Sequence, residues 1–134
     1  MERLLPLIWV VDQIDKDAIF MQQAMTRIEN PCQLLIFPDC LSILEHVSSL
    51  HRPPQFIVID YQLDGMNGYE LTQTLRLIPF LKRIPIGWLG DDMVMPTPRE
   101  LEELGVKWCW PKPANYPGWQ NLIEEFCQKA ADTM

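Results

Sequence analysis

The sequence predicts an α/β fold of the doubly wound class, with a five-stranded parallel sheet and five flanking helices. Five short apolar runs alternate along the chain with longer segments in which apolar residues recur every three or four positions. These longer segments have the length of helical crossovers, and strands joined by such crossovers pair in parallel. Right-handed crossovers then place helices on both faces of the sheet. We expect residues 1–134 to form one such domain, as suits a chain of this length.

The expected strands are short and mostly apolar runs, and the β-branched residues of the first run favour a strand buried on both faces of a parallel sheet. The runs comprise residues 7–11, 33–37, 56–59, 85–89 and 106–110. Asp12 ends the first run, Asp60 ends the third, and Lys112 follows the fifth.

The expected helices are marked by apolar stripes at helical spacing. The first helix covers residues 15–28 and is ended by Asn30-Pro31, and the second opens at Pro38-Asp39 and is broken over residues 51–54. The third carries Leu71, Leu75 and Ile78. The last helix has the longest apolar stripe, formed by Trp119, Leu122, Ile123, Phe126, Cys127 and Ala130. Thr97-Pro98 begins the fourth, with Glu100 as the capping-box partner, and Gly105 ends it.

The net charge of −7 excludes the uniformly basic surface of a typical nucleic-acid-binding domain. The same surplus of negative charge argues against an anionic membrane as partner. The apolar run near the amino terminus is too short to span a bilayer and lacks a cleavage site for a signal peptide. We therefore expect a cytoplasmic protein without nucleic-acid or membrane partners.

The four cysteines, Cys32, Cys40, Cys109 and Cys127, show neither a CxxC pair nor the spacing of a zinc site. A chain that can build its own hydrophobic core has little need of a disulfide framework. The sequence therefore predicts buried free thiols in a reducing compartment.

We expect a functional site at Asp12, Asp60 and Lys112. The carboxyl ends of parallel strands share one edge of the sheet, where ligands bind in open α/β folds. Two carboxylates and an ammonium group at that edge suit Mg²⁺ together with a phosphoryl group, and an aspartate carboxylate can act as a nucleophile toward phosphorus. The alternative is that both aspartates cap neighbouring segments and that Lys112 is a solvated loop residue.

The order of these residues resembles the receiver domain of bacterial two-component response regulators over essentially the whole chain. Val10-Val11-Asp12 resembles the first strand and acidic site of that family, residues 60–71 resemble its phosphoacceptor segment, and Lys112-Pro113 matches its Lys-Pro pair. The resemblance implies a flavodoxin-like topology with strand order 2-1-3-4-5. It also implies that Asp60 is phosphorylated, that Lys112 contacts the phosphoryl group, and that a cis bond precedes Pro113.

The resemblance further implies a Mg²⁺ site formed by Asp12, Asp60 and the Gln62 carbonyl group. The implied partners are a histidine kinase or phosphotransfer protein and a downstream protein that binds the face formed by the fourth helix, fifth strand and fifth helix, with a homodimer as a further option. The domain is then not an enzyme, beyond phosphotransfer to itself and slow hydrolysis.

Three residues depart from the family pattern. Gln13 stands where a second acid is usual, so Mg²⁺ binding should be weaker; Asp15 and Asp17 are nearby, but we assign them to the helix start. Gly90 stands where a Ser or Thr hydroxyl is usual, and it leaves room for a water or exposes a backbone N–H. Cys109 stands where the family usually has an aromatic residue whose ring swings inward as the switch, and a cysteine side chain cannot copy that movement.

Two main hypotheses follow. The first is a response regulator that signals by protein–protein contact, either as a stand-alone protein or as part of a longer one. The second, favoured by Gln13, Gly90 and Cys109, is a pseudo-receiver that binds partners without phosphorylation. A flavin or phosphate-ester protein of the same topology is disfavoured because no phosphate-cradling loop follows the first strand.

Overall fold

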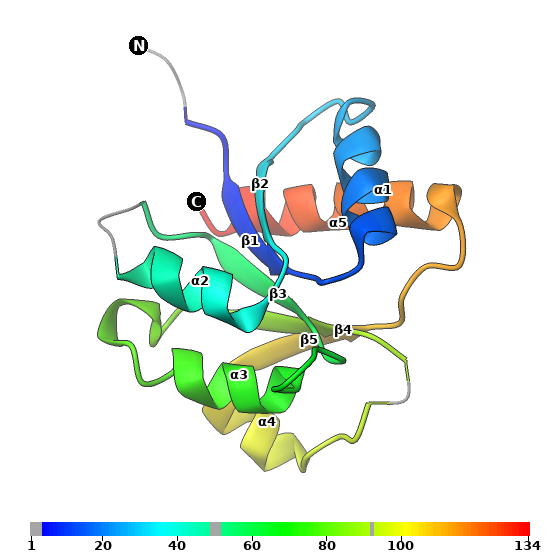
Figure 1. Ribbon diagram of the computed structural model, residues 1–134. Helices are drawn as coiled ribbons and strands as arrows, with labels where there is room; N and C mark the ends of the chain where they lie inside the picture. Colours follow the sequence, from blue (N-terminus) through cyan, green and yellow to red (C-terminus); the bar gives the residue numbers. More distant parts are fainter. Residues whose placement is uncertain (1–3, 49–51, 92) are drawn as a thin grey trace.

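The computed structural model describes residues 4–48, 52–91 and 93–134, and it confirms the predicted architecture. Five parallel strands form one sheet in the order β2-β1-β3-β4-β5 (Figure 1). The strands are β1 (Leu7–Val11), β2 (Gln33–Phe37), β3 (Phe56–Asp60), β4 (Ile86–Leu89) and β5 (Val106–Trp110). The helices are α1 (Asp15–Met25), α2 (Cys40–Val47), α3 (Gly68–Leu75), a 3₁₀ turn η1 (Pro79–Leu81), α4 (Pro98–Leu104) and α5 (Tyr116–Asp132).

Two helices end before the predicted residue. Helix α1 ends at Met25 rather than Ile28. At its end the Thr26 hydroxyl donates to the Gln23 carbonyl group, a local bond that competes with the helical pattern. Helix α3 ends at Leu75, and the predicted stripe continues into η1 instead.

The predicted boundaries of α4 are confirmed. The Thr97 side chain accepts a hydrogen bond from the Glu100 backbone N–H, and Pro98 occupies the first turn. Gly105 ends the helix with a φ of 72°, in the left-handed region that glycine adopts without steric cost. The predicted break after α2 lies partly on residues 49–51, outside the described residues.

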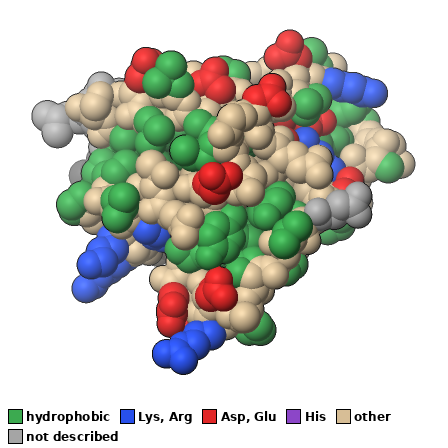
Figure 2. All heavy atoms as spheres, turned by 60° about the horizontal axis from the view of Figure 1, so that its bottom comes forward, with side chains coloured by type: hydrophobic (Ala, Val, Ile, Leu, Met, Phe, Trp, Pro, Cys, Tyr) green, Lys and Arg blue, Asp and Glu red, His purple; other side chains and the backbone are tan. Residues whose placement is uncertain are grey.

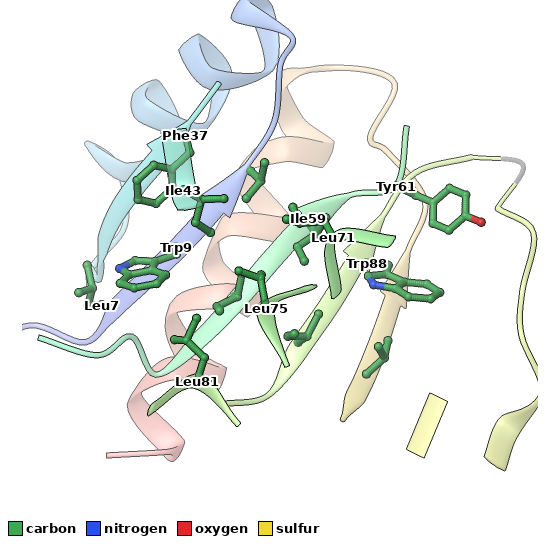
Figure 3. Close-up of a cluster of buried hydrophobic side chains, with 14 residues drawn as sticks. Leu7, Trp9, Phe37, Ile43, Ile59, Tyr61, Leu71, Leu75, Leu81 and Trp88 are labelled. Atoms are coloured by element: carbon green, nitrogen blue, oxygen red, sulfur yellow. The ribbon is translucent and has the colours of Figure 1, made fainter. Parts of the chain in front are cut away.

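The sheet separates two hydrophobic cores. Alternate residues of β1 point to opposite faces, so Trp9 belongs to the core under α2, α3 and α4, whereas Val10 belongs to the core under α1 and α5. Figure 3 shows the first core, in which Trp9 and Trp88 lie at opposite ends of the cluster. Both indole rings are fully buried, and the Trp88 Nε1–H donates to the Thr72 hydroxyl at 2.9 Å.

A bulge in β5 decides where its tryptophans lie. Ile86 pairs with Val106 but Gly87 pairs with Trp108, so Lys107 is an extra residue in the ladder. After the bulge, Trp108 and Trp110 both pack into the core under α1 and α5. A Cβ atom on Gly87 would lie 2.4 Å from the Trp110 ring, so the glycine provides the space for that ring.

The predicted free thiols are wrong for two of the four cysteines. Cys32 and Cys127, separated by 95 residues, form a disulfide that ties the segment before β2 to α5. Cys40 and Cys109 are free, and Cys109 is exposed rather than buried. Spacing could not reveal this pair, because the fold alone brings the two residues together. A disulfide is unusual in a reducing compartment, so the cytoplasmic location stays a prediction.

The surface over α3 and α4 carries dispersed acidic side chains with hydrophobic groups between them (Figure 2).

None of the helices in the described segments combines the length and apolar character that crossing a membrane requires.

Candidate functional site

The carboxyl edge of the sheet holds Asp12 and Asp60 on rigid backbone. Asp12 follows β1, and its N–H extends the ladder by donating to the Phe37 carbonyl group at 3.0 Å. Asp60 is the last residue of β3, and the next N–H, of Tyr61, donates to Leu89 at 2.9 Å. Both aspartates are almost completely buried, with 3% and 2% of their surface exposed. The chain thus holds two carboxylates at the edge where parallel sheets bind ligands.

Lys112 joins these carboxylates from the loop after β5. Its Nζ atom lies 2.8 Å from Asp60 Oδ2 and 3.7 Å from Asp12 Oδ2. The structure therefore brings Asp12, Asp60 and Lys112 into one cluster.

Asp17 is a site residue that our sequence reasoning missed. Its Oδ2 atom accepts a hydrogen bond from Lys112 Nζ at 2.6 Å, the shortest contact of that ammonium group. Asp17 lies in the first turn of α1, where side chains point back toward the helix amino terminus and so toward the end of β1. That direction was the available signal, since an acidic residue in the first turn after β1 can reach the sheet edge.

Burial and charge together set the protonation of the cluster. Burial raises the pKa of Asp12 to about 7, against the lowering effects of the Ile14 N–H and the Lys112 charge. Burial also raises the pKa of Asp60, although Lys112 and the Gln62 N–H act in the opposite direction. Burial lowers the pKa of Lys112, but its hydrogen bonds to Asp17 and Asp60 outweigh this effect and leave that pKa above its usual value. Lys112 is therefore the fixed cation of the site.

The donor set fits a divalent cation. Carboxylate oxygens of Asp12, Asp17 and Asp60 lie within 4.8 Å of one another, and hard cations such as Mg²⁺ prefer oxygen ligands. Asp12 Oδ2 is buried and has no hydrogen-bond partner, while the other oxygen accepts from the Ile14 N–H at 2.8 Å. A buried carboxylate oxygen without a donor is costly unless a cation serves it. The cluster can thus hold a divalent cation.

A cavity of about 500 Å³ opens beside the cluster and is lined by Asp60, Lys112 and residues of three loops. Gln13 contributes to its wall, where its side-chain oxygen accepts a hydrogen bond from the Asp64 N–H at 2.8 Å. The Gln62 N–H donates to Asp60 Oδ1 at 3.1 Å, which orients the carboxylate. The volume accommodates a phosphoryl group.

The structure corrects two expectations about the neighbouring residues and shows where Cys109 lies. The N–H of Gly90 donates to the Trp110 carbonyl group at 2.9 Å, so of the two alternatives for this glycine an N–H exposed toward the site is excluded. The described segments contain no cis peptide bond, so the cis bond before Pro113 is also wrong. Cys109 lies exposed on β5, with Trp108 and Trp110 packed into the core under α1 and α5.

We expect Asp12→Asn to stabilise the cation-free protein at pH 8. Because the pKa of Asp12 is higher in the folded state than the 3.8 of an ordinary aspartate, stability falls as pH rises from about 4 to about 7. The amide removes that penalty, for an expected gain on the order of 1–4 kcal/mol at pH 8 and little gain at pH 4. Urea unfolding in EDTA at both pH values measures the effect, with exposed Asp15→Asn as control. Equal gains at the two pH values would contradict the assignment.

Comparisons with known proteins support the fold. No protein-family model matches the sequence, and no curated protein matches it. Solved structures with the same architecture are response regulators and signal receiver domains. The chain therefore has the receiver fold.

Three of these structures illustrate the likeness. A phosphorylated cyanobacterial phytochrome response regulator, RcpA, is 19% identical with a TM-score of 0.75, and the match covers 97% of this chain and 96% of that one. The Mn²⁺-bound response regulator Rcp1 is 20% identical with a TM-score of 0.68, over 90% and 91% of the two chains. A response regulator receiver domain from Rhodospirillum rubrum is 22% identical with a TM-score of 0.70, over 96% and 94%.

Proposed function

We propose that the protein is a phosphorelay receiver that accepts a phosphoryl group on Asp60 from a histidine kinase or phosphotransfer protein. The observation that carries this proposal is the contact of Asp60 with Lys112 at 2.8 Å, at the wall of a cavity and next to the buried oxygen of Asp12 that has no hydrogen bond. Receiver-fold neighbours that are phosphorylated or hold Mn²⁺ support it.

In this proposal each residue has one role. A carboxylate oxygen of Asp60 attacks phosphorus, the P–N bond to the donor imidazole breaks, and the imidazole nitrogen keeps the electron pair of that bond. Lys112 holds the carboxylate before transfer and neutralises phosphoryl oxygens afterwards. Asp12, Asp60 and the Gln62 carbonyl group would hold Mg²⁺, which when bound supplies further positive charge for those oxygens.

Phosphorylation of Asp60 is expected to alter the surface of α4, β5 and α5, where a downstream protein or a second copy of the chain would bind. Gly90 and Cys109 occupy the positions from which a receiver usually transmits this change. Since neither residue has a hydroxyl or an aromatic ring, the signal must take another route here, and the output stays a protein contact.

The pseudo-receiver is the second candidate, and it is favoured by Gly90, which offers the site neither a hydroxyl nor a free N–H. In that case partners bind the unphosphorylated chain, and Asp60 serves only as an ion-pair partner of Lys112.

Exposure to a small phosphodonor distinguishes the two candidates. We expect the intact mass to increase by one phosphoryl group in the presence of Mg²⁺, with about 100-fold less product in Asp60→Asn because its amide is a poor nucleophile. Exposed Asp15→Asn, outside the cluster, should behave like the wild type. No mass gain at high donor concentration, with partner binding unchanged by Asp60→Asn, would reject the receiver in favour of the pseudo-receiver.

A further inference from the structure

We propose that Asp17 is the second acidic ligand of the divalent-cation site and performs the role that Gln13 cannot. The inference rests on the proposed cation site and assigns it a ligand that comes from helix α1 rather than from the residue after Asp12. Three observations carry it: the engagement of Gln13 elsewhere, the position of Asp17, and the buried oxygen of Asp12 that receives no hydrogen bond.

Gln13 is already committed to another contact. Its Oε1 atom accepts the Asp64 N–H at 2.8 Å and so ties the loop after β1 to the loop after β3. A neutral amide oxygen used in this way offers the cation no charge. The Gln13 side chain therefore shapes the cavity wall and leaves the position of an acidic ligand to another residue.

Asp17 supplies that charge from the adjacent element. Only 13% of its side chain is exposed, and one of its carboxylate oxygens lies within 4.8 Å of carboxylate oxygens of both Asp12 and Asp60. Burying a third carboxylate against two others is unfavourable unless cations compensate it. Lys112 is one such cation, and its short contact with Asp17 shows that the carboxylate points into the cluster and not toward solvent.

Lys112 alone neither neutralises the charge of the three carboxylates nor supplies all of their hydrogen bonds. When all three carboxylates are ionised, they and one ammonium group leave two formal negative charges, which one divalent cation neutralises. Independently of this charge, the fully buried Oδ2 atom of Asp12 has no hydrogen-bond donor, because Lys112 Nζ is 3.7 Å away. The oxygen without a hydrogen bond and the surplus charge occur at the same place, and a divalent cation between Asp12, Asp17 and Asp60 accounts for both.

The rival interpretation is that Asp17 only holds Lys112. Asp17→Asn distinguishes the two, because the amide oxygen can still accept the Lys112 hydrogen bond while the charged ligand is lost. Titration with Mn²⁺ alone, followed by electron paramagnetic resonance and by relaxation of water protons, reports both affinity and the number of waters on the ion. Neither readout depends on phosphorylation.

We expect Asp17→Asn to weaken Mn²⁺ binding by about 10- to 100-fold and to raise the number of bound waters, because water replaces the lost carboxylate. Asp15→Asn, an equal change of charge at an exposed position on the same turn, should leave both unchanged. If Asp17→Asn does not fold, Asp17→Glu keeps the charge and tests the geometry, with an expected change in the water count.

The possible outcomes distinguish an error in the role of Asp17 from an error in the proposed cation site itself. If the wild type does not bind Mn²⁺, the cation site itself is rejected. If the wild type binds Mn²⁺ and Asp17→Asn, or Asp17→Glu where it replaces that variant, matches it in affinity and in bound waters, only the role of Asp17 is overturned.

Discussion

Replacing Lys112 with methionine should destabilise the cation-free protein by about 3–5 kcal/mol at pH 8, because it leaves buried carboxylates without their partner. The Lys112 ammonium group contacts Asp17 at 2.6 Å and Asp60 at 2.8 Å, and the Asp60 side chain is only 2% exposed. Methionine keeps most of the side-chain volume, so the loss of stability reports the missing charge and not a cavity. Urea unfolding in EDTA measures it.

The destabilisation of Lys112→Met should depend on pH in a defined direction. Without the ammonium group the pKa values of Asp12 and Asp60 rise further above their unfolded values, so the folded state binds more protons than the unfolded state. Stability is then greatest at low pH and is lost as pH rises through the raised pKa values, so the deficit at pH 5 should be smaller than at pH 8. A divalent cation at about 100 times its dissociation constant should restore about 2.7 kcal/mol.

Lys107→Met is the matched control, because Lys107 is an exposed lysine on β5, the strand that precedes the loop of Lys112. It should change stability by no more than about 0.5 kcal/mol. A Lys112→Met protein as stable as this control at pH 8 in EDTA would show that the carboxylates do not need the ammonium group.

Loss of the Cys32–Cys127 disulfide should be the other large effect. The bond closes a loop with 95 residues of sequence separation, and such a link restricts the unfolded chain strongly. We expect reduction of the wild type to lower the free energy of unfolding by about 2–5 kcal/mol. Denaturant titrations with and without dithiothreitol measure the difference.

Cysteine variants make this test specific. Cys32→Ser should abolish the response to dithiothreitol, whereas Cys109→Ser, at an exposed free thiol, should leave it intact. Thiol counting on the denatured, unreduced protein should find two reactive groups, since Cys40 and Cys109 are the free cysteines. Four reactive thiols together with no effect of dithiothreitol would contradict the bond.

Patterns local in the chain predicted most of the fold. Apolar runs such as residues 7–11 and the cap and stop at Thr97 and Gly105 follow from neighbouring residues alone, so the strands and the boundaries of α4 were confirmed. Helix ends that depend on a single competing bond, as at Thr26, were misplaced by a few residues. The bulge at Lys107 was not predictable, because the space for Trp110 is provided by Gly87 on another strand.

The residues of the candidate site likewise fall into those that the sequence predicted and those that only the structure revealed. The sequence by itself determined that Asp12, Asp60 and Lys112 share one edge of a parallel sheet, because the parallel direction of the strands follows from their alternation with helices. Only the tertiary structure decided that Asp17 reaches Lys112, that Gln13 is occupied by the Asp64 N–H, and that Cys32 meets Cys127. These contacts join separate elements, and their existence depends on side-chain directions and packing distances that sequence spacing does not encode.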